Sequence, residues 1–170
     1  MKYHDFFLNN VNTSDTVLDV GCGNGSVAYD VAKKARSVIG IDIDENKIKD
    51  AKKNFLLDNI EYICGDILNW KFRQKFNVII LSNVLEHIED RLEFLEKIKR
   101  LGKKFLIRVP MIDRNWVVLY KKELGIDYRL DKTHQIEYTF NNFKEELEKA
   151  GLEVKDYSIQ FGEIWAVVEK

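Results

Sequence analysis

The sequence predicts an α/β protein in which helices cover both faces of a mostly parallel β-sheet. Short apolar runs rich in β-branched residues alternate along the chain with segments whose apolar residues recur at helical spacing. A glycine-rich turn joins the first of these runs to the first helical segment. The 170 residues, 45% of them hydrophobic, are enough to form the core of one domain, which we expect to span residues 1–170.

The first predicted strand, residues 16–20, leads directly into the glycine-rich turn. Gly21, Gly23 and Gly25 fall at alternate positions, and helical spacing begins at Ser26. Glycine lets a ligand approach the backbone where a side chain would block it. A strand, glycine turn and helix in this order bind nucleotide-like ligands at the carboxyl edge of a parallel sheet.

Two acids narrow the choice of ligand. A dinucleotide site would read G-x-G-x-x-G, whereas Ser26 occupies the position of the third glycine. Asp19 lies two residues before the first glycine, where a carboxylate repels a pyrophosphate but suits the ammonium group of an amino-acid tail. Asp42 ends the second predicted strand, residues 37–41, where a carboxylate can accept the hydroxyls of a ribose.

The middle of the chain continues the alternation. Asp44 is expected to cap a helix whose inner face carries Ile48, Ala51 and Phe55. Residues 60–64 and 76–81 are the third and fourth predicted strands. The stretch between these strands is too short for the usual helix, so we expect a loop or an extended segment there.

The second half adds two helices and three strands. Asp90 and Glu93 predict a capping box for a helix that carries Leu92, Leu95 and Ile98 and stops at Gly102. The fifth strand is expected over residues 105–109. A last helix is predicted from its cap, inner face and stop, which are Thr139, Phe143, Leu147, Ala150 and Gly151. Residues 152–159 and 164–168 are expected to form a closing hairpin.

The motifs VLDVGCGNGS and VIGIDID resemble those of class I S-adenosylmethionine-dependent methyltransferases. The run NVLEHI, from Asn83 to Ile88, resembles the subgroup that contains ubiquinone-biosynthesis O-methyltransferases. This resemblance implies a Rossmann-like sandwich with a seven-stranded sheet in the order 3-2-1-4-5-7-6 and an antiparallel last strand. It also implies methyl transfer from S-adenosyl-L-methionine, which leaves S-adenosyl-L-homocysteine.

The resemblance implies that the cofactor contacts the strand ends and the turns that follow them. In the family, an acid after the third strand faces the adenine amino group and the next residue covers the ring, which are Asp66 and Ile67 here. By itself, Asp66 would more simply cap a turn. The full set of cofactor residues implied in this way is Asp19, Gly21, Cys22, Gly23, Asn24, Gly25, Asp42, Ile43, Asp66, Ile67, Ser82 and Asn83.

Two histidines are candidates for the chemical step. An oxygen acceptor must lose a proton when it is methylated, and a nearby histidine can take that proton. His87 follows the fourth strand, and His134 lies in the long segment after the fifth. Either histidine is a candidate base, and the simpler alternative for His87 is a hydrogen bond that shapes the loop.

A metal site is a further alternative. Asn83, Glu86 and His87 lie at i, i+3 and i+4, on one face of a helical turn, and His134 could complete the set. Some relatives with an E-x-x-E-H pattern bind a divalent ion, but this chain has Asn83 in place of the first glutamate. Because an amide is a poorer ligand than a carboxylate for a hard cation, we expect no metal.

Residues 110–136 are expected to form a substrate lid, because the segment follows the fifth strand and is longer than a connection requires. Trp116 and Tyr120 are its expected anchors, and the alternative is a helix packed on the sheet edge. Near the N-terminus, aromatic and polar residues could likewise cover the cofactor, namely Tyr3, His4, Phe6 and Phe7.

The remaining features concern partners and location. A net charge of −1, with lysines and acids interspersed, argues against a nucleic-acid surface. The chain lacks both the Asn/Asp-Pro-Pro-aromatic run of nucleobase amino-group methyltransferases and a Pro-Cys nucleophile. We therefore expect a small-molecule acceptor, with oxygen favoured by the resemblance. The alternatives are an RNA or protein methyltransferase and a catalytically silent S-adenosylmethionine-binding module.

The sequence also suggests where the protein works. It contains no apolar run long enough for a membrane span and no signal-peptide pattern, and Cys22 and Cys64 are expected to be free thiols. These features favour a cytoplasmic protein, expected as a monomer or homodimer.

Overall fold

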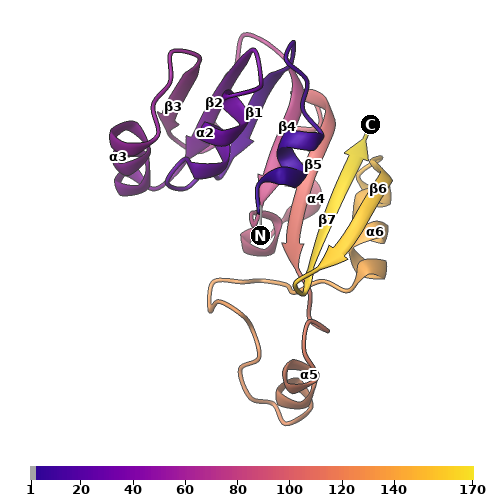
Figure 1. The fold of residues 1–170 in the computed structure, drawn as a ribbon. Coiled ribbons are helices and arrows are strands. Elements are labelled where there is room, and N and C mark those ends of the chain that lie inside the picture. The colour runs from indigo at the N-terminus through magenta and orange to yellow at the C-terminus, as the bar shows by residue number, and fades with distance from the viewer. Residues whose placement is uncertain (1–2) are drawn as a thin grey trace.

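The computed structural model describes residues 3–170. Its strands form one seven-stranded sheet in the order β3-β2-β1-β4-β5-β7-β6 (Figure 1). Strands β1 to β5 pair in parallel, and β7 runs antiparallel to both β5 and β6. This arrangement confirms the predicted fold class and strand order. The strands are β1 (Thr16–Val20), β2 (Ser37–Asp42), β3 (Ile60–Cys64), β4 (Phe76–Ser82), β5 (Gly102–Pro110), β6 (Glu153–Gln160) and β7 (Glu163–Glu169).

Helices cover both faces of the sheet, and each face has its own hydrophobic core. One core packs against α1 (Asp5–Asn9), α2 (Ser26–Ala32) and α3 (Glu45–Asn54). The other packs against α4 (Arg91–Ile98) and α6 (Phe140–Lys149). Alternate residues of β4 face opposite cores, which explains why this central strand is a continuous apolar run. No helix in the described part of the chain is long and apolar enough to cross a membrane.

Two predicted helix caps are present as expected. The Asp44 side chain accepts hydrogen bonds from the backbone N–H groups of Asn46 and Lys47 at the start of α3. Thr139 caps α6 by accepting from the N–H of Asn142. After this helix, Gly151 has a φ of 70°, the left-handed conformation that ends many helices. Cys22 and Cys64 are free thiols.

The prediction for α4 is partly wrong. Asp90 accepts from the N–H of Glu93, but the Glu93 carboxylate pairs with Lys97 at 2.6 Å, so the capping box is not closed. Leu92 is 42% exposed, because the buried face is formed by Phe94, Leu95 and Ile98 and the first turn lies at its edge. The helix ends at Ile98, and Gly102 begins β5, which extends beyond the predicted residues 105–109 at both ends.

The connection between β3 and β4 contains no helix or strand, as expected. The long connection after β5 contains α5 (Trp116–Glu123), which projects away from the sheet (Figure 1). Val118 is the buried residue of α5, whereas Trp116 is 74% exposed and Tyr120 is 53% exposed. Both the expected anchoring role of these aromatics and the alternative of a helix packed on the sheet edge are therefore wrong.

Candidate active site

A pocket of about 280 Å³ lies at the carboxyl ends of the parallel strands. Five predicted cofactor residues line it: Gly21, Asp42, Ile43, Asp66 and Ile67. The prediction missed seven further lining residues, which are Val20, Ile41, Gly65, Leu68, Val84, Ile88 and Phe94. Most of these are apolar residues whose pattern matches that of ordinary core positions, so the sequence held no signal that they line a pocket.

The glycine turn is held tightly against its neighbours. Gly21 has a φ of 66°, and a Cβ atom there would lie 2.7 Å from Val84 Cγ2. Gly25 has a φ of 85°, and a Cβ atom there would lie 2.6 Å from the Tyr62 hydroxyl. A side chain at either position would therefore push the turn away from β3 or from the segment after β4.

Other residues predicted to bind the cofactor lie outside the lining of this pocket. Cys22 is buried, and its Sγ would lie 2.9 Å from a Cβ atom built on Gly40, so it serves the packing between the turn and β2. The Ser82 hydroxyl accepts a bond of 3.4 Å from Arg108 Nη1. The complete set outside the lining is Asp19, Cys22, Gly23, Asn24, Gly25, Ser82 and Asn83.

Asp19 lies near the carboxyl end of β1, two residues before the glycine turn. It is 1% exposed, and its Oδ2 atom has no hydrogen-bond partner within residues 3–170. Burial and, to a lesser extent, the charge of Asp42 raise the pKa of Asp19 to about 8. A buried carboxylate with a free oxygen beside a second acid favours a positively charged ligand group.

Asp42 joins the glycine turn to the start of α3. Its Oδ2 atom accepts from the N–H of Gly23 at 2.7 Å, and its Oδ1 atom accepts from the N–H of Asp44 at 2.9 Å. Because each carboxylate oxygen has two lone pairs, both oxygens can accept a further hydrogen bond from a ligand hydroxyl. Asp66 likewise accepts from Leu68 N and Asn69 Nδ2 while lining the pocket, so it both caps a turn and faces the ligand space.

A second group of polar residues lies where β4 ends. Asn83 has a φ of 56° and leads into a 3₁₀ turn, η1 (Leu85–His87). Glu86 is completely buried, and neither of its carboxylate oxygens has a hydrogen-bond partner in the described chain. Burial raises the pKa of Glu86 to about 8. The Asn83 Oδ1 atom is also buried and likewise has no hydrogen-bond partner in the described chain.

The structure brings both predicted histidines to this place. The rings of His87 and His134 meet edge to face with their centroids 4.7 Å apart. One possible ligand atom from each of Glu86, His87 and His134 lies within 4.8 Å of the others. Burial and the charge of His134 lower the pKa of His87, which favours the neutral ring. Since Val84 and Ile88 line the first pocket, this cluster borders it.

Buried, partnerless polar atoms need an explanation, because leaving them without hydrogen bonds costs free energy. Here they belong to Asn83, Glu86 and His134, whose Nδ1 atom lies 3.4 Å from Glu137 Oε1 without hydrogen-bond geometry. A polar ligand would satisfy them. The cluster can therefore hold an acceptor hydroxyl, take up its proton or bind a cation.

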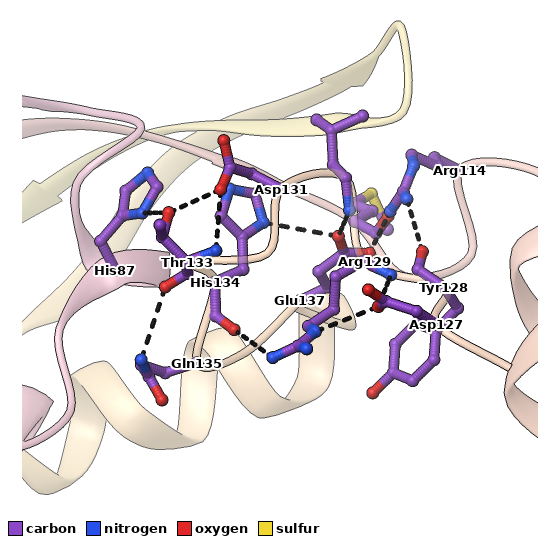
Figure 2. Close-up of polar contacts among 12 residues, drawn as sticks. His87, Arg114, Asp127, Tyr128, Arg129, Asp131, Thr133, His134, Gln135 and Glu137 are labelled. Carbon is purple, nitrogen blue, oxygen red and sulfur yellow. Dashed lines mark hydrogen bonds and ion pairs between the residues drawn. The ribbon is translucent and has the colours of Figure 1, made fainter. Parts of the chain in front are cut away.

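A set of polar contacts holds His134 in place (Figure 2). The buried Glu137 side chain pairs with Arg114 and accepts from the N–H of Leu130. Arg114 also donates to the carbonyl oxygens of Met111 and Tyr128, which ties the start of the 111–137 segment to its end. After α5, the backbone N–H of Gln135 donates to the Glu86 carbonyl oxygen at 2.7 Å, which brings the segment back beside the residues that follow β4.

The N-terminal residues expected to cover the cofactor lie elsewhere. Tyr3 donates to Glu163 at 2.9 Å, and the rings of Tyr3, Phe6 and Phe7 pack around Trp165. His4 Nδ1 lies 2.6 Å from Asp30 Oδ2 on α2. This expectation was wrong because the apolar face of α1 is buried on the sheet at β7, away from the lining of the cofactor pocket.

Comparisons with known proteins agree with this geometry. The profile of a methyltransferase domain family matches residues 12–159. A ubiquinone biosynthesis O-methyltransferase of Coxiella burnetii is 34% identical over 119 residues, which cover 66% of this chain and 50% of the relative. The mitochondrial enzyme of that name from Schizosaccharomyces pombe is 34% identical over 99 residues, covering 53% and 36%. This chain therefore spans half or less of the length of these two curated relatives.

A solved structure shows the same fold. An S-adenosylmethionine-dependent methyltransferase from Methanosarcina mazei superposes with a TM-score of 0.76 at 18% identity, and the match covers 96% of each chain.

Proposed function

The chain belongs to the class I S-adenosylmethionine-dependent methyltransferases, and from this premise we propose that it transfers a methyl group to an oxygen of a small-molecule acceptor. One observation carries the proposal. The segment after β4 supplies Val84 and Ile88 to the cofactor pocket, and it supplies Asn83, Glu86 and His87 to the polar cluster that His134 completes, so a bound acceptor could meet both.

The residues in and beside the pocket fit S-adenosylmethionine. Asp19 lies outside the lining, and its raised pKa keeps the ligand-free carboxyl largely protonated near pH 7, but the ammonium group of a bound ligand tail would favour the ionised form. Asp42 has lone pairs left for ribose hydroxyls, and Ile43, which is 79% exposed at the pocket, offers an apolar surface to a base. A dinucleotide fits less well, because its pyrophosphate would meet two acids.

Methyl transfer makes modest demands on the protein. The acceptor oxygen forms a bond to the methyl carbon, and the methyl–sulfur bond breaks with its electron pair left on sulfur. Much of the acceleration comes from holding the reactants in line. The acceptor proton must also leave, and a neutral His87 or His134 can take it. The lowered pKa of His87 supports this role, since more of the ring is neutral near pH 7.

The experiment that tests the proposal is an acceptor screen read by formation of S-adenosylhomocysteine. Phenols, catechols, sugars, lipids and RNA would each be offered with S-adenosylmethionine. We expect turnover with a hydroxylated small molecule, and His87→Ala and His134→Ala should lower it while nearly preserving cofactor affinity. Methylation of RNA alone would contradict the proposal, and cofactor binding without any turnover would favour a silent binding module.

A specific observation supports a second candidate, in which a divalent cation grips the acceptor hydroxyl. The sequence argued against a metal, but Glu86, His87 and His134 lie close enough to share one ion. Histidine nitrogens with a carboxylate suit zinc, iron or manganese. Chelator treatment followed by add-back of single metals separates the candidates, because base catalysis survives metal removal and cation-assisted transfer does not.

A further inference from the structure

We propose that Thr133 and Asp131 position His87 by placing its proton on Nδ1, so that Nε2 keeps a free lone pair. The use of that lone pair as a proton acceptor rests on the proposed function. The position of the proton does not, and it can be measured without turnover.

The Thr133 hydroxyl lies between Asp131 and His87 (Figure 2) and has a single hydrogen to donate. The Thr133 Oγ1 atom lies 2.7 Å from Asp131 Oδ1 and 2.9 Å from His87 Nδ1. The same Asp131 oxygen also accepts from the backbone N–H of Thr133 at 2.8 Å. Because an ionised carboxylate can only accept hydrogen bonds, the hydroxyl hydrogen must point to Asp131.

Two observations indicate that Asp131 is ionised. The residue is exposed to solvent, and hydrogen bonds from the Thr133 backbone and hydroxyl lower its pKa. With its hydrogen donated to Asp131, Thr133 Oγ1 can only accept from His87. The hydrogen of that bond therefore belongs to Nδ1 of His87, and in the neutral ring Nε2 is the unprotonated nitrogen.

The contact between His87 and Thr133 joins two segments that are far apart in the chain. His87 follows β4, whereas Asp131 and Thr133 belong to the 111–137 segment that contains α5. The tautomer of His87 is thus set by residues that reach it only when this segment has returned to the sheet. Ordering of the segment and readiness of His87 to accept a proton become one event.

The test is nitrogen-15 NMR of the histidine rings in chelator-treated protein at about pH 8, above the ordinary histidine pKa. The chain has three histidines, so His87→Gln assigns the signals. We expect His87 to show a protonated Nδ1 and a bare Nε2. Thr133→Val keeps the shape of the side chain but removes the hydroxyl, and Asp131→Ala frees that hydroxyl to donate to Nδ1. Both variants should therefore move the proton from Nδ1 to Nε2.

Two variants serve as controls. Thr133→Ser retains the hydroxyl and should restore the Nδ1 proton, and Thr13→Val removes a hydroxyl from an exposed loop and should change nothing. With an acceptor from the screen, Thr133→Val should lower kcat about tenfold or more at unchanged cofactor affinity, since general bases contribute about a hundredfold or more. A proton on Nε2 in the unmodified protein, or an unchanged tautomer in folded Thr133→Val, would overturn the proposal whether or not the chain methylates anything.

Discussion

At the scale of single residues, Asp19 links the cofactor site to the pH dependence of stability. Its folded-state pKa of about 8 lies above the ordinary value, so ionisation is disfavoured in the folded protein. Its contribution to the free energy of unfolding should therefore fall as pH rises from about 4 to about 8. We expect Asp19→Asn to stabilise the ligand-free protein at pH 8 by a few kcal/mol and much less at pH 5.

Urea unfolding of both proteins at the two pH values measures this difference. Comparing the variant with the unmodified chain cancels the contribution of other groups, including Glu86, whose pKa is also raised. An equal difference at pH 5 and pH 8 would show that Asp19 titrates normally. The same variant should bind S-adenosylmethionine more weakly, because the opposite charge for the ammonium group is lost.

Asp42 has two roles, and its substitution should reveal both. Asp42→Ala removes the acceptor for Gly23 N and Asp44 N as well as the proposed ribose contact. Each lost bond to a charged group costs about 1.5–3 kcal/mol, so cofactor affinity should fall tenfold or more. Calorimetric titration gives the affinity. An affinity equal to that of the unmodified protein would remove Asp42 from the ribose site.

At the scale of elements, the 111–137 segment depends on the buried pair of Arg114 and Glu137. Glu137→Gln leaves the guanidinium without its counter-charge and should cost about 1.5–3 kcal/mol of local stability. Trypsin should then cleave at Lys121 and Lys122 of α5 about tenfold faster or more. Asp127→Asn, which breaks the exposed pair with Arg129, is the matched control and should leave the cleavage rate unchanged.

The exposed face of α5, which carries Trp116, is a candidate surface for contact with the acceptor. We predict that the segment closes over the acceptor and excludes water from the transfer. Trp116→Ala should then change the free energy of unfolding by less than about 0.5 kcal/mol, because the side chain is 74% exposed, yet raise the KM for the acceptor. An unchanged KM would show that this face of α5 does not meet the acceptor.

At the scale of the whole molecule, ligand binding should stabilise the fold. S-adenosylmethionine at a hundred times its Kd adds about 2.7 kcal/mol, or roughly 5–10 °C in Tm for a domain of this size. Differential scanning calorimetry measures the shift, with NAD as the matched control. A shift with NAD and none with S-adenosylmethionine would contradict the proposed ligand.

Features that depend on neighbouring residues could be predicted before the fold was known. The ends of every strand except β5 fall within one residue of those expected, and the glycine turn and the caps at Asp44 and Thr139 are where local periodicity and local hydrogen bonding place them. The positions of Asp19 and Asp42 at the carboxyl edge follow in turn, because parallel strands bring their ends together.

Contacts between segments far apart in the chain could not be predicted in this way and are seen in the folded structure alone. His87 and His134 meet because the long segment returns to the residues after β4, where the Gln135 N–H donates to the Glu86 carbonyl oxygen, and no local pattern encodes that return. The exposure of Trp116 and Leu92 and the burial of Glu86 depend on what packs nearby, since amphipathic spacing cannot show how wide the covered face is. Contacts between residues far apart in the chain set burial, and burial sets the pKa and the hydrogen-bond needs of each polar group.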